Sequence, residues 1–332
     1  MAPIINGRIL FNEIPKEYPE PGKTVVYDAS EKIDPDTVPL NGGFLLKTVD
    51  VSIDPYMRGR MRDPGITSYV PAFQIGKPID GYVIAKVIRS ENPEVKAGDH
   101  LFGGLPYQHY TLLKDFGDLR VIENKENLAW FTYLGVLGMP GKTAYMAWKE
   151  YSQAKKGETV FVSAGAGPLV IQLTKMDGLR TIGTAGSKEK LKFLEEIGTD
   201  ISFNYKDGDI SKILRDQGGI DIYWDNVGGD LLDKALEASK LYGRFIECGM
   251  ISGYNTGYNK PILNLFQIFS RSLTMHGFIV NRLEPKYNDE FYKVMPPLVA
   301  TGKIRHKEDV TRGVEKVEGW NNGKAVVHVA DD

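Results

Sequence analysis

The sequence predicts an α/β protein in which an irregular β domain precedes a doubly wound parallel sheet. Residues 1–125 are rich in glycine, proline and short strand-like runs and show little helical periodicity. In residues 126–301, apolar runs of strand length alternate with amphipathic segments of about ten residues. Strands joined through helices form right-handed crossovers in a parallel sheet, so we place a second domain there.

The first domain is predicted from strands bounded by turn residues. They are residues 24–27, 43–53 and 80–88, and a turn at 95–98 leads into one more. The tail, residues 323–330, is a strong strand without a local partner. We therefore expect residues 302–332 to complete the first domain.

The second domain begins with a helical stretch at 132–151, interrupted by Gly-Met-Pro-Gly at 138–141. The predicted strands are 159–163, 180–184, 201–204, 220–224, 242–248 and 274–280. The predicted helices are 168–177, 187–197, 208–217, 229–239 and 289–301. No internal repeat is present.

Composition excludes several classes of protein. The 332 residues are 42% hydrophobic and 25% charged with a net charge of -2, so no basic excess indicates a nucleic-acid partner. No apolar run of about 18 residues indicates a membrane span, and the N-terminus lacks signal-peptide features. One cysteine, Cys248, and five histidines without ligand spacing predict no metal site. We expect a cytoplasmic protein.

A glycine-rich turn follows the first strand of the second domain. Val160-Phe-Val162 is a buried strand, Gly165 and Gly167 form the turn, and Pro168 occupies a first helical position. Free N–H groups at such a helix start bind anions, which suits a dinucleotide pyrophosphate. Val170 stands where the third glycine of G-x-G-x-x-G would be, so an ordinary glycine turn fits this stretch equally well.

The end of the next strand distinguishes the two nicotinamide dinucleotides. NAD-binding domains place a carboxylate there, but this strand ends in Thr184-Ala-Gly-Ser187, with Lys188 and Lys190 just beyond. Hydroxyls, a helix N-terminus and a lysine favour the 2′-phosphate of NADP. The alternative is that Ser187 only caps a helix and the lysines are solvated.

Five ordered motifs resemble those of the zinc-independent medium-chain dehydrogenase/reductases. The similarity is closest to the group of leukotriene B4 dehydrogenase, prostaglandin reductase and plant double-bond reductases, and it covers nearly the whole chain. The motifs are Val51-Ser-Ile-Asp-Pro-Tyr-Met-Arg-Gly-Arg-Met61, Gly138-Met-Pro-Gly-Lys-Thr-Ala-Tyr145, Asp225-Asn-Val-Gly-Gly229, Cys248-Gly-Met-Ile-Ser252 and Gly277-Phe-Ile-Val280.

This resemblance implies a GroES-like first domain, a Rossmann domain and NADPH-dependent reduction of the C=C bond of α,β-unsaturated aldehydes and ketones. It also implies a homodimer that forms through the edge strand 274–280. The substrate would be a small hydrophobic enal or enone. The glycine turn and residues 314–320 are both shorter than in the family pattern.

The resemblance also assigns cofactor-binding residues. Those near the 2′-phosphate are Gly186, Ser187, Lys190 and Tyr205. Those along the nicotinamide and the rest of the cofactor are Met139, Thr143, Asn226, Cys248, Phe278, Val280 and Asn321, with Gly165 and Gly167 at the turn. Tyr56 and Tyr254 match two tyrosines that flank the substrate.

We expect the reaction to need a donor for the enolate oxygen that forms when hydride adds to the β-carbon. Tyr254 is the first candidate, because it follows the fifth strand on the ligand-binding edge, and Tyr56 is the second. Either tyrosine could instead be a pocket wall that only packs on substrate.

The alternating arginines and the class of reaction each have more than one interpretation. Arg58, Arg60 and Arg62 alternate and would share one face of a strand, as salt-bridge partners or as ligands of a substrate carboxylate. Two other functions also fit: a zinc-free quinone reductase, and a non-catalytic NADP-binding protein favoured by the shortened glycine turn.

Overall fold

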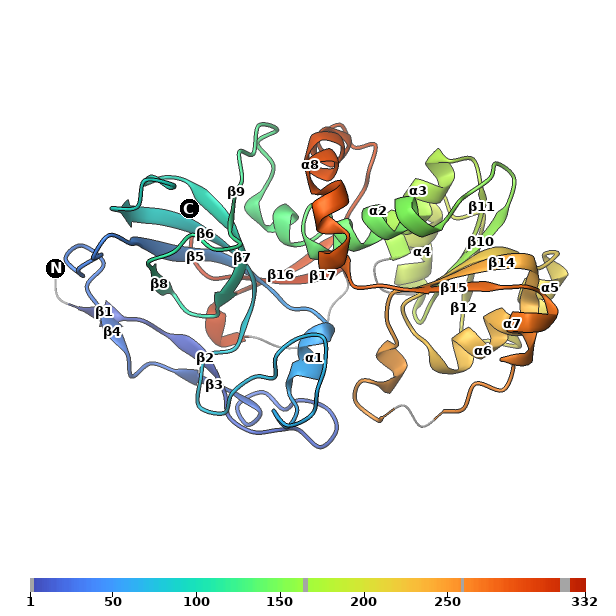
Figure 1. Cartoon of the computed structure of the whole chain (residues 1–332), viewed down its shortest axis with the longest axis horizontal. Helices are drawn as coiled ribbons and strands as arrows, with labels where there is room; N and C mark the ends of the chain where they lie inside the picture. The colour runs from blue at the N-terminus through green and yellow to red at the C-terminus, as the bar shows by residue number, and fades with distance from the viewer. Residues whose placement is uncertain (1–2, 164–166, 258–259, 317–322) are drawn as a thin grey trace. The chain divides into compact units, whose positions relative to one another are not determined.

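The chain divides into two compact units, one formed by 1–138 with 307–332 and the other by 139–306. A computed structural model describes residues 3–163, 167–257, 260–316 and 323–332 (Figure 1). The division lies at 138/139 and 306/307, whereas the sequence placed it at 125/126 and 301/302.

Specific contacts explain where the units divide. The ring of Trp130 stacks on His100 at 3.8 Å between centroids and its Nε1 donates to Asp332 at 2.9 Å, so the segment after residue 125 belongs to the first unit. Arg305 N donates to Gln172 Oε1 at 2.7 Å, and Gln172 Nε2 donates to Arg305 O at 2.8 Å. These bonds hold the segment after residue 301 in the second unit.

The first unit is built on a seven-stranded sheet. Its path is β16-β17-β5-β6-β7-β9, and β8 pairs with β5. The bounds are β5 (Phe44–Ser52), β6 (Asp80–Ser90), β7 (His100–Pro106), β8 (Tyr110–Leu113), β9 (Arg120–Val121), β16 (Glu308–Arg312) and β17 (Lys324–His328). The sequence placed the tail strand in this sheet, and β17 pairs there antiparallel with β5. Nine successive residues of β5 are buried or half-buried, which makes it the central strand.

Smaller elements surround this sheet. They are β1 (Ile4–Ile5), β2 (Arg8–Phe11), β3 (Val25–Asp28), β4 (Lys32–Ile33), α1 (Tyr56–Arg60) and the 3-10 helices η1 (Trp130–Leu134) and η4 (Val314–Lys316). β1 pairs with β4 and β2 with β3. Phe11, Phe44, Val83 and Tyr107 are fully buried in the core of this unit. α1 was missed, because its arginines alternate as they would on a strand.

The second unit is a six-stranded parallel sheet with the order β12-β11-β10-β13-β14-β15. Its strands are β10 (Thr159–Val162), β11 (Arg180–Ala185), β12 (Ile201–Asn204), β13 (Ile220–Asp225), β14 (Ser239–Glu247) and β15 (Thr274–Gly277). This order is that of dinucleotide-binding domains, whose ligands lie at the carboxyl ends of the strands where the order reverses. Here that point lies between β10 and β13.

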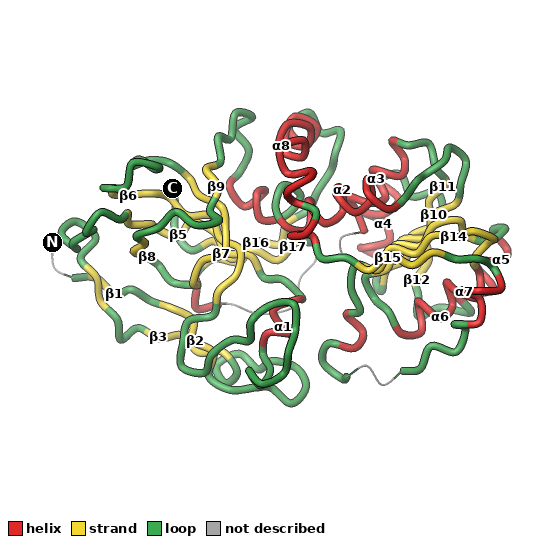
Figure 2. Tube along the Cα trace, in the orientation of Figure 1, coloured by secondary structure: helices red, strands yellow, loops and turns green. Residues whose placement is uncertain are grey.

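Helices lie on both faces of this sheet, as Figure 2 shows in red. The helices of this unit are α2 (Met139–Tyr151), α3 (Gly167–Met176), α4 (Lys188–Glu196), α5 (Ile210–Asp216), α6 (Gly229–Ala238), α7 (Phe266–Ser270) and α8 (Glu284–Ala300), with 3-10 turns η2 (Ile251–Gly253) and η3 (Val280–Arg282). α8 packs on α2 and η3 rather than on the sheet. α2 packs on α3 and α8, while α5 packs on α6. The predicted helix 132–151 is two elements, η1 and α2, because the chain turns at Gly135 and Gly138. Among the described residues, no helix is long and apolar enough to cross a membrane.

Candidate active site

The carboxyl edge of the six-stranded sheet gathers most of the residues that the sequence proposed for the cofactor. Gly186 and Ser187 follow β11, Asn226 follows β13, and Cys248 follows β14. Gly167 is the first residue of α3. Gly165 and Asn321 lie outside the described residues.

Four of the predicted cofactor residues lie at the carboxyl ends of β11 and β12: Gly186, Ser187 and Lys190 follow β11, and Tyr205 follows β12. Ser187 caps α4, and its Oγ accepts a hydrogen bond from Lys190 N at 3.4 Å. A Cβ on Gly186 would lie 2.8 Å from Tyr205 Oη, so only glycine leaves the phenol room there. Ser187 and Lys190 are exposed. The cluster offers hydroxyl, ammonium and helix N–H groups and contains no carboxylate from β11, which is the donor set that a 2′-phosphate requires.

Met139 and Thr143 lie one turn apart on α2. Thr143 Oγ1 donates to Met139 O at 2.7 Å and lies 3.5 Å from Met139 Sδ. Thr143 is buried and Met139 is half-buried. The Thr143 hydroxyl proton is therefore bonded to the helix backbone. Towards a ligand, these two residues present mainly apolar surface.

Asn226 joins the ends of β10 and β13. Its Nδ2 donates to Ser163 O at 3.0 Å, and its Oδ1 accepts from Trp224 Nε1 at 3.2 Å. Ser163 Oγ accepts in turn from Asn226 N at 2.7 Å. These bonds fix the switch point of the sheet, so Asn226 shapes the loop around a ligand rather than offering a free amide.

Asp225 organises the turn that follows. Its Oδ1 accepts from Tyr223 Oη at 2.9 Å, from Val227 N at 2.7 Å and from Gly228 N at 2.9 Å. Gly228 has φ +65°, a left-handed conformation that favours glycine. The sequence motif contained Asp225, but its role as the acceptor at the centre of this turn was not predicted.

Glu247 is a second buried carboxyl beside Asp225 that sequence reasoning missed. The two residues are neighbours across β13 and β14. Asp225 Oδ2 and both carboxyl oxygens of Glu247 are buried without a donor among the described residues. Desolvation and the Asp225 charge raise the pKa of Glu247 to about 9. The raised pKa favours a protonated Glu247 carboxyl beside Asp225 at neutral pH.

Cys248 follows Glu247 and is not a reactive thiol. Burial, with the charges of Asp225 and Glu247, raises its pKa to about 12. A thiol this far from ionisation is a poor nucleophile. Its backbone N–H donates to Asp225 O at 2.9 Å, so it helps to place the loop that leads to Tyr254.

Phe278 and Val280 form an apolar wall after β15. The Phe278 ring lies 6.0 Å from the Trp224 ring and 5.9 Å from the Tyr151 ring. Val280 is buried in η3. These residues give the edge of the sheet an aromatic side of the kind that lines small-molecule sites.

Tyr254 stands at the end of η2, in the loop after β14. It is half-buried, and its N–H donates to Ile251 O at 3.3 Å. A Cβ on Gly249 would lie 3.0 Å from Tyr254 Oη. A side chain at position 249 would therefore crowd the phenol, which packs against the glycine just after β14. The hydroxyl is thus held at the carboxyl edge of the sheet.

Tyr56 belongs to the first unit, where it starts α1. It lies edge-on to Tyr82 with ring centroids 6.3 Å apart. Burial and the nearby Asp54 carboxyl raise its pKa, which keeps the phenol protonated.

The three alternating arginines do not share one strand face, because Arg58 and Arg60 lie in helix α1 and Arg62 lies in the loop after it. Arg60 is buried and bonds Asp80 through Nη1–Oδ2 and Nη2–Oδ1, both 2.8 Å, and its guanidinium lies 4.1 Å from the Phe73 ring centroid. Arg62 donates to backbone oxygens of its own loop. Arg60 and Arg62 are therefore structural groups of the first unit.

Comparison with known proteins agrees with this geometry. Residues 16–121 match a family described as the N-terminal domain of oxidoreductase, and residues 165–300 match the zinc-binding dehydrogenase family. The chain is 39% identical to an NADP-dependent oxidoreductase of Cochliobolus heterostrophus over 98% of each chain. It is 42% identical to a 2-alkenal reductase (NADP(+)-dependent) of Nicotiana tabacum over 86% of this chain and 87% of the relative.

A solved structure extends the similarity to the fold. CurA from Vibrio vulnificus, in complex with NADPH, has a TM-score of 0.88 at 30% identity, with coverage of 98% of this chain and 100% of CurA. Fold and relatives together define an NADP-dependent oxidoreductase. The chain belongs to the zinc-independent medium-chain dehydrogenase/reductase family. Its cofactor is NADP(H), which the residues after β11 fit.

The name of the matched dehydrogenase family refers to zinc. The whole sequence contains one cysteine. Among the described residues there is no group of three or more His, Cys, Asp and Glu side chains that could bind a metal ion.

Proposed function

We propose that this protein reduces the C=C bond of α,β-unsaturated aldehydes and ketones with NADPH. The observation that carries the proposal is the position of Tyr254, a hydroxyl donor on the same strand edge as the residues that fit NADP(H). The 2-alkenal reductase of Nicotiana tabacum, at 42% identity, supports the substrate class.

The reaction needs three things at this edge. Bound NADPH supplies hydride to the β-carbon of the substrate. Tyr254 donates to the carbonyl oxygen, where negative charge develops, and so lowers the barrier as an oxyanion-hole donor does. The enolate then takes a proton on its α-carbon, from water or from a tyrosine, which completes the reduction. Phe278 and Val280 offer apolar surface, which excludes water and suits a small hydrophobic substrate.

Tyr56 is the second candidate donor. Because burial raises its pKa, it also keeps its proton and can donate. Comparing Tyr254→Phe with Tyr56→Phe identifies which phenol serves the substrate oxygen.

The first experiment follows NADPH oxidation with an alkenal, an aryl-substituted enone, a quinone and no substrate, each repeated with NADH. We expect turnover of the alkenal or enone, faster with NADPH. Turnover of the quinone alone would instead indicate a quinone reductase. No turnover together with no NADPH binding in a titration would contradict the proposal.

Tyr254→Phe tests the mechanism. Loss of one donor to the developing oxyanion is expected to lower kcat by about 100-fold while NADPH affinity stays unchanged. Tyr18→Phe is the control, because Tyr18 is 64% exposed in the first unit. An unchanged kcat in Tyr254→Phe would remove Tyr254 from the mechanism.

A further inference from the structure

A buried ion pair joins two distant parts of the chain just before Tyr56. Lys324, the first residue of β17, places its Nζ 2.8 Å from Asp54 Oδ1, and Asp54 lies between β5 and α1. The two residues are 270 positions apart in the sequence. Asp54 is 4% exposed, so its carboxylate is almost fully out of water. A buried carboxylate needs such a cation, because an unpaired charge in the interior is costly.

The same lysine also holds the backbone of this turn. Lys324 Nζ donates to Ile53 O at 2.7 Å, so its ammonium group bonds two successive residues. Asp54 O in turn accepts from Met57 N at 3.1 Å in the first turn of α1. Tyr56 is the first residue of that helix. The backbone that presents the Tyr56 ring is therefore fixed from β17, through Lys324.

The carboxylate and the phenol at this turn differ in how they are bonded. Asp54 Oδ1 is bonded to Lys324, and Asp54 Oδ2 accepts from Ser52 Oγ. Within the described parts of the chain, the Tyr56 hydroxyl forms no hydrogen bond. Burial and then the Asp54 charge raise the pKa of Tyr56, which keeps the proton on the phenol. That proton is therefore available to a ligand.

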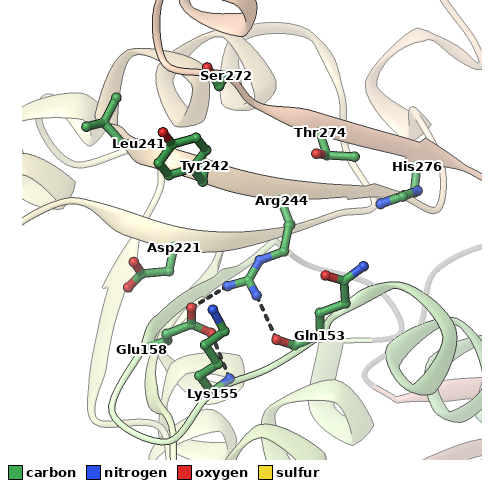
Figure 3. Close-up of a pocket in the computed structure, with 10 residues that line it drawn as sticks. All are labelled: Gln153, Lys155, Glu158, Asp221, Leu241, Tyr242, Arg244, Ser272, Thr274 and His276. Atoms are coloured by element: carbon green, nitrogen blue, oxygen red, sulfur yellow. Dashed lines mark hydrogen bonds and ion pairs between the residues drawn. The ribbon is translucent and has the colours of Figure 1, made fainter.

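A second buried ion pair provides a comparison. In the second unit, Arg244 Nη2 lies 2.6 Å from Glu158 Oε1, and Arg244 is 8% exposed. Figure 3 shows this pair and the side chains around it, none of which is a proposed cofactor or substrate residue. The Asp54–Lys324 pair differs from it, because it holds the turn that carries Tyr56.

We propose that Lys324 is a positioning residue that keeps the Tyr56 hydroxyl available as a hydrogen-bond donor to the substrate. Lys324 does so by neutralising Asp54 and by fixing the turn before α1. This inference rests on the proposed function, in which Tyr56 is one of two candidate donors. Without Lys324, Asp54 Oδ1 loses its donor and competes with the substrate oxygen for the phenol proton.

The test is a double-mutant cycle on kcat/KM for an aryl-substituted enone, with saturating NADPH and the full-length protein. Methionine at position 324 keeps the apolar stem of the lysine and removes its charge. Lys324→Met is expected to lower kcat/KM about tenfold in the native background. In a Tyr56→Phe background it is expected to lower kcat/KM by less than about twofold, because Lys324 acts through the phenol.

Further variants separate the effect of charge from that of folding. Lys324→Met combined with Asp54→Asn removes both charges, and its kcat/KM is expected to lie within about threefold of the native value. Lys324→Gln leaves a donor for Ile53 O, and it replaces Lys324→Met in the cycle if that variant does not fold, with an expected loss of about threefold. Arg244→Met is the matched control, because it breaks a buried ion pair away from Tyr56, and kcat/KM should stay within about twofold.

The results that would overturn this inference are distinct from a failure of the proposed function. Equal losses in the native and Tyr56→Phe backgrounds would show that Lys324 only stabilises the fold. An equal loss in Arg244→Met would indicate a general effect of breaking buried ion pairs. Unchanged kcat/KM in Lys324→Met, in a protein that reduces the enone, would contradict this inference alone. No enone turnover by the native protein would contradict the proposed function, and this inference with it.

Discussion

Replacing Glu247 by glutamine is expected to make the protein less sensitive to rising pH. Glu247 lies beside Asp225, and its pKa is raised from 4.5 to about 9. Between these two values the folded protein holds one proton more than the unfolded chain. Its stability therefore falls as pH rises, by up to about 1.4 kcal/mol per pH unit.

The sign and the pH window follow from the raised pKa. The contribution of Glu247 is fully present below about pH 4.5 and is lost as the pH rises through about 9. From pH 6 to pH 8 this single group lowers the free energy of unfolding by up to about 2.7 kcal/mol. A glutamine side chain in its place carries no titratable proton, and its amide can still donate to Asp225.

Two other titratable side chains lie around the pair. Tyr223 donates to Asp225 Oδ1, and Cys248 follows Glu247 in the chain. Burial raises the pKa of Cys248 to about 12 and that of Tyr223 well above its usual value, so neither ionises between pH 6 and pH 8. The difference in pH dependence between the native protein and Glu247→Gln therefore reports on the carboxyl pair.

The assay is urea unfolding at pH 6, 7 and 8 without cofactor, followed by tryptophan fluorescence, which includes the fully buried Trp224. The free energy gained by Glu247→Gln relative to the native protein should grow by about 2 kcal/mol from pH 6 to pH 8. Glu196→Gln, at an exposed glutamate, should give no such trend. Parallel pH dependence of the native protein and Glu247→Gln would refute the raised pKa of Glu247.

Two further predictions concern the cofactor and the assembly. Lys190→Ala should raise the KM for NADPH about tenfold and leave the KM for NADH unchanged. Lys192→Ala, on the same helix, is the control and should change neither value. Steady-state kinetics with both cofactors would check this. We also propose a homodimer through β15, the edge strand of the six-stranded sheet, so light scattering should give about twice the chain mass, and a mass of 37.0 kDa would contradict it.

Local patterns in the sequence predicted most of the second unit. β10, β11, β12 and β13 lie within a residue or so of their predicted bounds, because buried strands and amphipathic helices each have a period that neighbouring residues reveal. Gly186 and Ser187 were predicted to lie at the cofactor phosphate for the same reason, since the end of a strand and the cap of the following helix are both local features. The order of the strands was predicted only as a class, through the crossover rule.

Long-range pairing decided the rest. Asp225 and Glu247 lie side by side only because β13 and β14 pair in one particular register, and nothing in either segment alone reveals it. Arg60 bonds to Asp80, which lies 20 residues away in the chain, and this pairing makes Arg60 a buried structural group. The alternation of the arginines in the sequence did not predict this partner. The sequence by itself determined most elements of the second unit and the cofactor class, because those depend on local periodicity and short motifs. Only the tertiary structure decided which charges are paired and which are left without a partner, because burial and pairing depend on residues far apart in the chain.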